Sequence, residues 1–235
     1  MQLRVAPPIF EHYPQLLLGV LVLSDVNNRG QFDELNGLLQ EAQVELRQSL
    51  AGVTLSEHPQ IASWREAYRV FGVKAKQYPS SIENLLKRVV KGEQLRSINP
   101  LVDLYNVVSM RRLMPIGGED IDTLQGDLQL RIAGEDEPPV YLLGDREAKA
   151  PKPGEVMYAD DEGAICRRFN WKEAERSKLT ENTQRAVLVI EALPPVTEAE
   201  LRAVLDELSE LAKRFCGVTA TPHIISPASP AAPLA

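Results

Sequence analysis

Cys166 and the acidic pair Asp160 and Asp161 are the first residues whose types and neighbours could do chemistry. Cys166 precedes two arginines, and nearby positive charge lowers the pKa of a thiol and makes it a better nucleophile. A lone cysteine in a strand is more often a small residue of the core, and we favour that interpretation. The acidic pair precedes Glu162 and Gly163, which indicates a hairpin turn before it indicates a metal or acid–base site.

The common catalytic and ligand-binding motifs are missing from the sequence. The three histidines, His12, His58 and His223, are far apart and form no HxxxH or HxH pair, so they predict no metal site. The sequence contains no GxxxxGKS or GxxxxGKT loop, no GxGxxG and no GxSxG, which excludes the usual phosphate loops and the hydrolase nucleophile elbow. We therefore predict neither a metal nor a cofactor.

The stretch VDLYNVVSMRRLMPIGGED, residues 102–120, places polar and charged residues around a break in the chain. Its first part has the residue types of a helix, and Pro115 stops that helix. Gly117 and Gly118 follow, where bare backbone lets N–H groups approach a ligand closely. A tight turn between a helix and a strand is the other interpretation of the two glycines, and both interpretations stay open.

The charge of the chain is unevenly distributed. The net charge is −7, which argues against a sequence-independent nucleic-acid binder. Residues 61–115 contain ten basic and four acidic residues and sum to +6, which leaves −13 for the rest of the chain. A basic face on an acidic protein is compatible with local docking of a polyanion, although solvated helix faces would give the same pattern.

The composition is that of a folded globular protein, because 44% of the 235 residues are hydrophobic. No apolar run approaches the ~20 residues that a membrane-spanning helix needs. The early run LLLGVLVLSDV lacks a basic leader and a small-residue cleavage site, so it predicts a buried strand and not a signal peptide. Two cysteines without metal-ligand spacing suggest a reducing, cytoplasmic setting.

Hydrophobic periodicity predicts an α+β fold, with a helix-rich first half, a strand-rich middle and a closing helix. We expect one domain over residues 1–217, and a disordered tail rich in proline and alanine over residues 218–235. The helices are expected over residues 33–50, 57–72, 79–92, 99–113 and 197–217. The strands are expected over residues 16–26, 127–133, 139–144, 155–160, 164–169 and 185–192.

Capping residues mark the starts of three of these helices. Ser80 with Glu83, and Thr197 with Glu200, have the spacing of capping boxes. Asn99 precedes a proline and fits the N-cap position of the helix that enters the stretch 102–120.

That stretch and the residues after it resemble a known family, the tRNA-binding editing domain of the phenylalanyl-tRNA synthetase β subunit, made of that subunit's third and fourth modules. The family pattern is V-D-x-x-N on a helix, a P-L-H-A-F-D turn, and G-x-x-x-x-R-x-A along a strand. This sequence matches the pattern without a gap over residues 102–133. The matching residues are Val102, Asp103, Asn106, Pro115, Asp120, Gly126, Arg131 and Ala133.

Two later segments extend the resemblance to about residue 192. EVMYADDEGAI resembles a family strand that ends in an alanine–aspartate pair, here Ala159 and Asp160. TQRAVLVIEA resembles the family segment T-x-N-V-x-L-E-x-A, through Thr183, Val187, Glu191 and Ala192. The preceding segment and the short length resemble free-standing members of the family, which lack the synthetase's catalytic core and anticodon-binding parts.

The resemblance implies an α+β fold with a mixed β-sheet and packed helices. In the synthetase this domain hydrolyses tyrosine wrongly attached to the phenylalanine tRNA. The resemblance therefore implies a trans-acting deacylase of mischarged aminoacyl-tRNA, with tRNA as its partner, no membrane partner and no cofactor. The alternatives are a non-catalytic tRNA- or RNA-binding module and an amino-acid-like small-molecule binder on the same fold.

The resemblance also implies where the pocket lies. Gly117 stands where the family has its histidine, so no catalytic histidine is carried over. Backbone amides and the terminal ribose hydroxyl of the substrate are expected to supply part of the chemistry. The expected pocket residues are Asn106, Ser109, Gly117, Gly118, Asp120, Asp160, Asn170 and Glu173. The residues expected to bind tRNA are Arg88, Lys91, Arg111 and Arg112, although the last two also fit favourable charge at a helix end.

Overall fold

The computed structural model describes residues 1–234 and builds them from ten strands and six α-helices. The strands are β1 (Gln2–Val5), β2 (Leu17–Leu23), β3 (Ile116–Asp120), β4 (Leu128–Ile132), β5 (Val156–Asp160), β6 (Gly163–Arg167), β7 (Lys172–Glu173), β8 (Ala186–Ala192), β9 (Ala220–Ile225) and β10 (Ala231–Pro233). The helices are α1 (Pro7–His12), α2 (Asp33–Ser49), α3 (Pro59–Val70), α4 (Ser81–Val90), α5 (Pro100–Arg112) and α6 (Glu198–Cys216).

The strands form two sheets. The six-stranded sheet has the order β10-β1-β4-β5-β6-β7. It is mixed, because β1 runs parallel to β4 while every other pair of neighbouring strands in the sheet is antiparallel. The four-stranded sheet has the order β3-β8-β2-β9 and is antiparallel throughout. The expected α+β fold with a mixed sheet is confirmed.

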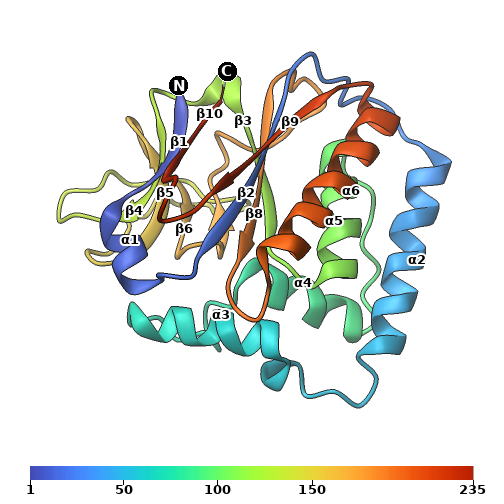
Figure 1. Cartoon of the computed structure of the whole chain (residues 1–235), viewed down its shortest axis with the longest axis horizontal. Coiled ribbons are helices and arrows are strands. Elements are labelled where there is room, and N and C mark those ends of the chain that lie inside the picture. The colour runs from blue at the N-terminus through green and yellow to red at the C-terminus, as the bar shows by residue number, and fades with distance from the viewer. Residues whose placement is uncertain (235) are drawn as a thin grey trace.

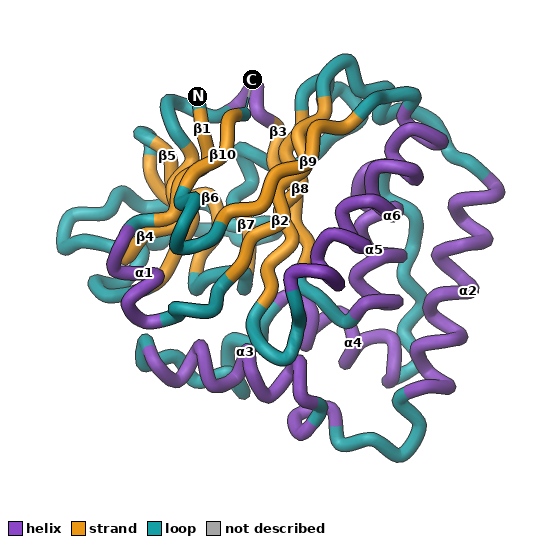
Figure 2. The backbone as a smooth tube through the Cα atoms, viewed as in Figure 1, coloured by secondary structure: helices purple, strands orange, loops and turns teal. Residues whose placement is uncertain are grey.

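The four-stranded sheet lies between the six-stranded sheet and a layer of helices. In Figure 1, α2, α5 and α6 stand on the side of this sheet away from β1, β4 and β5, and Figure 2 shows the same separation of helices from strands. Helix α6 packs closely on β2, since a Cβ atom at Gly19 would lie 2.9 Å from Leu201 and 3.3 Å from Leu205. The central sheet is therefore covered on both faces.

Strand β8 shows how the sequence produces this central layer. Val187 and Val189 belong to the core that contacts the six-stranded sheet. Leu188 and Ile190 alternate with them and belong to the core beneath the helices. A strand that is buried on both faces reads as a continuous apolar run, so the expected strand over residues 185–192 is confirmed as β8.

The helix starts follow the caps that the sequence indicates, with one difference. Asn99 accepts a hydrogen bond from the Val102 N–H at 3.1 Å, and Thr197 forms a complete capping box with its partner at the start of α6. Ser80 accepts from the Glu83 N–H at 3.3 Å, but the Glu83 carboxylate does not reach back to the N-cap. It instead forms ion pairs with arginine and lysine side chains, so only half of the expected capping box exists.

Two expected elements differ from the structure. Residues 139–144 form no strand and contribute only isolated bridges, at Val140 and Leu142. Gly117 and Gly118 do not form the expected turn, because they lie inside β3 and pair with β8. The chain reverses earlier, at Leu113, whose φ of 54° is left-handed. Glycine is a weak strand former, and pairing with a buried neighbouring strand overrides its local preference here.

The expectation of a disordered tail over residues 218–235 is wrong for residues 218–234. This segment forms β9, which pairs with β2, and β10, which pairs with β1. Ile225, Ala232 and Leu234 are buried in the structure and anchor it. The prolines of this segment indicate disorder when the sequence is considered alone. Edge strands tolerate proline, however, and both β9 and β10 lie at sheet edges. Ala235, the last residue of the predicted tail, lies outside the described residues.

Two neighbouring isoleucines test whether β9 is part of the folded structure. Ile225 is fully buried and Ile224 is only partly buried. We expect Ile225→Ala to lower the free energy of unfolding by about 2–4 kcal/mol, because it leaves a cavity in the core. The matched change Ile224→Ala should cost only about 1 kcal/mol. Urea unfolding measures both, and two equally small losses would contradict an ordered β9.

Candidate functional site

A cavity of about 300 Å³ opens between the two sheets. Strands β3 and β8 line one side of it, and β5, β6 and β7 line the other. Helices α4 and α5 contribute the remaining wall. The polar and charged residues that line the cavity are Ser81, Asn84, Arg88, Tyr105, Asn106, Ser109, Glu119, Tyr158, Cys166, Asn170, Lys172, Glu173 and Glu191.

The two adjacent glycines of β3 have different roles. A Cβ atom added at Gly117 would meet nothing within 4 Å, so this residue leaves open space in the cavity. A Cβ atom at Gly118 would lie 2.5 Å from Leu188 and 2.8 Å from Leu179. Gly117 therefore provides room, whereas Gly118 is required by packing.

One hydrogen bond indicates which backbone amides of β3 face β8. The Ile121 N–H, directly after β3, donates to the Arg185 carbonyl at 2.9 Å. The amides of an antiparallel strand alternate in direction, so the N–H of Gly117 points toward β8 and that of Gly118 points toward the outer edge. The Asp120 N–H, which points the same way as that of Gly118, donates to the Ser177 carbonyl at 2.9 Å, and Glu119 forms a bridge with Lys178, so residues 177–178 pair along this edge of β3.

Glu191 on β8 is held by a short polar chain. The Tyr158 hydroxyl donates to one oxygen of its carboxylate at 2.8 Å, and the Asn170 amide donates to the other. Tyr68 in turn donates to the Asn170 carbonyl oxygen at 2.9 Å. Burial raises the pKa of Glu191 to about 7, although the two hydrogen bonds act against this shift.

Two further glutamates line the cavity. Burial raises the pKa of Glu119 well above its usual range, and the charge of Glu173 raises it further. Burial and the charge of Glu175 raise the pKa of Glu173 to about 7. Within residues 1–234, no hydrogen bond engages the Glu173 carboxylate, and the buried Oε2 atom of Glu119 lacks a well-aligned partner, although the nearby Ser177 hydroxyl lowers the pKa of Glu119. Both carboxyl groups are therefore available to a ligand.

Cys166 shows that the three glutamates surround one space. Burial raises the pKa of its thiol well above the usual value, and the charges of Glu119, Glu191 and Glu173 all add to that effect. The thiol thus stays protonated near neutral pH and is a poor nucleophile. This agrees with a packing role for Cys166, and the neighbouring arginines do not activate it.

Six of the eight expected pocket residues line the cavity together. They are Asn106, Ser109, Gly117, Gly118, Asn170 and Glu173. Asp120 and Asp160 are not among the lining residues, because each is used in local structure.

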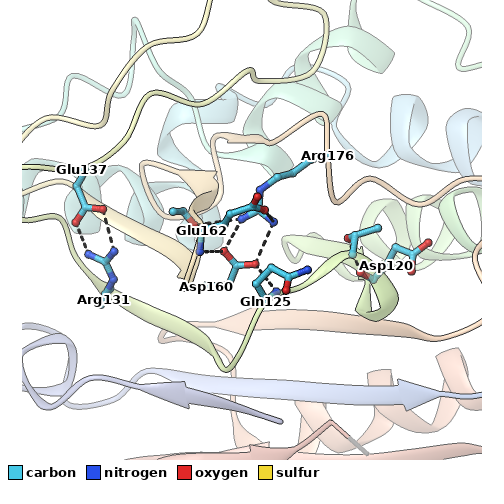
Figure 3. Close-up of polar contacts among 9 residues, drawn as sticks. Asp120, Gln125, Arg131, Glu137, Asp160, Glu162 and Arg176 are labelled. Carbon is cyan, nitrogen blue, oxygen red and sulfur yellow. Dashed lines mark hydrogen bonds and ion pairs between the residues drawn. The ribbon is translucent and has the colours of Figure 1, made fainter.

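Figure 3 shows how these two aspartates are held. Asp120 accepts from the Asp122 N–H at 3.0 Å and from the Thr183 hydroxyl at 2.7 Å. Asp160 accepts two hydrogen bonds from the Arg176 guanidinium, at 2.5 Å and 3.0 Å, and one from the Gln125 N–H at 2.8 Å. Both carboxylates thus fix the turns that follow their strands.

The four expected tRNA-binding cations are divided between two places. Arg88 lines the cavity and also pairs with Glu93 at 2.6 Å, and Lys91 is exposed just after α4. Arg111 and Arg112 lie at the end of α5 and do not line the cavity. Both pair with Glu207 of α6, at 3.7 Å and 2.6 Å. Arg88 is the one of the four that reaches the cavity.

The sequence interpretation omitted several residues of the cavity, above all Glu119, Glu191 and Tyr158. Glu119 could have been found by alternation, because residues 117 and 119 of a strand share one face. That signal requires residues 117–118 to be a strand and not a turn. Glu191 stood in a segment that carried the family resemblance but was not assigned to the pocket.

The fold and the cavity define an α+β domain with a carboxylate-lined site between two sheets. Residues 63–217, more than half of the chain, match the B3/4 domain family. The chain belongs to the B3/4 domain family.

Known relatives agree with this assignment. The phenylalanine--tRNA ligase beta subunit of Mycoplasma pneumoniae is 32% identical over 80 residues, and that of Psychrobacter arcticus is 35% identical over 94 residues. These alignments cover 34% and 40% of this chain, but only 10% and 11% of the relatives. The chain thus spans about a tenth of the length of the relatives it matches, and the expected relationship to this subunit is confirmed.

A solved structure was also found to be similar. It is an N-terminal fragment of the phenylalanyl-tRNA synthetase beta-subunit from Pyrococcus horikoshii, which shares 11% sequence identity with this chain. The superposition covers 93% of this chain and 49% of that chain, with a TM-score of 0.46. Within residues 1–234, none of the helices combines the length and the apolar character that crossing a membrane requires.

Matched alanine substitutions separate the roles of the two glycines. We expect Gly118→Ala to lower the free energy of unfolding by about 1–3 kcal/mol, because the added methyl group collides with two buried leucines. Gly117→Ala should be neutral or stabilising by up to about 1 kcal/mol, since its methyl group enters open space. Urea unfolding of both variants measures the difference, and equal losses would contradict the assigned geometry.

The raised pKa of Glu191 predicts how stability depends on pH. The folded state binds the proton more tightly than the unfolded chain, so stability is greatest below the ordinary pKa of 4.5 and falls as the pH rises toward about 7. Between pH 5 and pH 8, wild type should lose about 1–3 kcal/mol more than Glu191→Gln, which cannot titrate. Urea unfolding across this range measures the loss. The exposed control Glu181→Gln should follow wild type, and an unchanged profile in Glu191→Gln would refute the prediction.

Proposed function

We propose that this chain hydrolyses the ester bond of mischarged aminoacyl-tRNA, with the aminoacylated end of the tRNA in the cavity. The observation that carries the proposal is the group of buried carboxylates beside the open space at Gly117, in a chain of the B3/4 domain family. The cavity is within the usual size of a small-molecule site, and it combines apolar surface with convergent polar groups.

In the proposed reaction, Glu173 acts as the general base. Its carboxylate is half-buried and has a pKa of about 7, which suits proton transfer near neutral pH. It takes a proton from a water molecule, and that water attacks the carbonyl carbon of the ester. The side-chain amide of Asn106, which lines the cavity, donates a hydrogen bond to the oxyanion that forms. The protonated Glu173 then returns the proton to the departing ribose oxygen, which yields a free amino acid and a tRNA with a free hydroxyl.

The remaining groups would position the substrate. The neighbouring ribose hydroxyl of the tRNA can help to hold the water, which reduces the need for the missing histidine. Arg88 and Lys172 line the cavity and carry positive charge that can contact phosphate. Lys172 is paired with Asp145 at 2.6 Å, and Arg88 is paired with Glu93 at the same distance. On RNA binding, a phosphate group would replace the carboxylate partner of each cation.

A second candidate function rests on Gly117 itself. Because this position holds no histidine, the fold could bind tRNA and leave the ester intact. A salt-dependent affinity for tRNA without hydrolysis would identify a non-catalytic RNA-binding module. Saturable binding of an amino acid or aminoacyl analogue without any effect of tRNA would identify the small-molecule binder.

Deacylation of a panel of mischarged tRNAs tests the proposal. We expect the purified chain to accelerate loss of the aminoacyl bond for at least one member of the panel. Glu173→Gln should lower that rate by about 10²–10⁴-fold, because general-base catalysis contributes that much. The exposed control Glu181→Gln removes the same charge elsewhere and should keep the wild-type rate.

Two results of this experiment would count against the proposal. No acceleration for any tRNA would exclude the deacylase, and an undiminished rate in Glu173→Gln would exclude the assigned base. Gly117→Trp tests the place of the site, because an indole would fill the open space beside that residue. Full activity in that variant would show that the reaction occurs elsewhere.

A further inference from the structure

Glu119 is the residue of the cavity that the proposed reaction leaves unused. Its side chain is only 8% exposed, and its Oε2 atom has no hydrogen-bond partner within residues 1–234. Buried polar groups are nearly always paired, and an unpaired carboxylate is among the most costly groups to bury. An unpartnered oxygen in the wall of a cavity therefore indicates a ligand group that pairs with it.

The surroundings of Glu119 call for a positively charged ligand group. The negative charge of Glu173 acts on it, as does that of Asp160. The Ser177 hydroxyl and Arg176 act in the opposite sense. The hydroxyl carries no charge, and the Arg176 guanidinium is held in ion pairs with Asp160 and Glu162, at 2.5 Å and 3.3 Å. The local excess of negative charge is therefore not neutralised by the protein itself.

An organic cation suits this arrangement better than a metal ion. Within the described residues, no group of three or more histidine, cysteine, aspartate and glutamate side chains is arranged to hold a metal. An ammonium group needs only one carboxylate and two further acceptors, and it is neutralised by a single charge.

We propose that Glu119 forms an ammonium subsite, which receives the α-ammonium group of the aminoacyl moiety. This inference rests on the proposed function, since it names the substrate class of the same cavity. Gly117 and Glu119 share the face of β3 that lines the cavity, and residues two apart in a strand are ~6.6 Å apart. In an aminoacyl ester one carbon atom separates the carbonyl group from the α-nitrogen. An ester group in the open space at Gly117 thus leaves the ammonium group near Glu119.

The subsite makes a free α-amino group a condition for binding. An ester whose nitrogen is acylated, as in a peptidyl or formylated aminoacyl group, carries no positive charge there. It would leave the Glu119 carboxylate buried and unpaired, which lowers affinity. The cavity therefore selects aminoacyl esters with a free amine and rejects N-acylated ones.

Stable amide analogues test this without any hydrolysis. The probes are 3′-deoxyadenosines that carry an alanyl, leucyl or tyrosyl group on a 3′-amine, each compared with its des-amino and N-acetyl forms. Dissociation constants follow from calorimetry or from the fluorescence of Trp171, which lines the cavity. For at least one amino acid, we expect the free amine to bind about tenfold or more tightly than both other forms.

Glu119→Gln should reduce this preference to about twofold or less by weakening binding of the free amine alone. Its affinity for the des-amino form should not fall, which also shows that the variant is folded. Asp122→Asn removes an exposed charge just after the same strand and should keep the preference. Equal affinities within every set, failure of all probes to bind, or a preference that survives in Glu119→Gln would each overturn the subsite. A retained preference without any deacylation would uphold the subsite and reject the deacylase.

Discussion

The hydrogen bond from Tyr158 to Glu191 joins the two sheets across the cavity. Tyr158 belongs to the six-stranded sheet and Glu191 to the four-stranded sheet, and 2.8 Å separates their oxygens. Asn170 and Tyr68 extend the same polar chain to the β6–β7 turn and to α3. Loss of any member would leave a buried polar group unpaired, which costs more than the hydrogen bond itself contributes. The spacing of the two sheets, and with it the width of the cavity, depends on this chain.

The three carboxylates of the cavity reduce the stability of the fold. Apolar residues could occupy the same three positions, and the cost of burying three carboxyl groups would then be avoided. The pKa values of Glu173 and Glu191, both about 7, show that burial dominates over the opposing effects, which are the positive charge of Lys178 for Glu173 and two hydrogen bonds for Glu191. Groups whose pKa is shifted by burial and by one another are typical of functional sites. The carboxylates are thus better explained by a ligand than by folding.

The sequence predicted correctly those elements in which the local preference of the residues matches their burial and contacts in the folded structure. Strand β8 is apolar from Ala186 to Ile190 because both faces are buried, and α6 carries a complete capping box. The errors came where tertiary contacts override local preference. Gly117 and Gly118 have the residue types of a turn but are held in β3 by pairing with β8, and β9 and β10 contain prolines that edge positions accept. The same error removed Glu119 from the predicted site, because this residue faces the cavity only if β3 is a strand.

Position 117 and position 119 are best understood together. They share one face of β3, and the family pattern that this sequence resembles has an imidazole at the first position and an aromatic ring at the second. In this chain the first side chain is absent and the second ends in a carboxyl group, so the strand lacks two rings and presents open space beside a buried acid. No proton acceptor is then left at position 117. A base must come from across the cavity, where Glu173 has the exposure and the pKa for that role, and the strand itself is left to bind and orient the substrate.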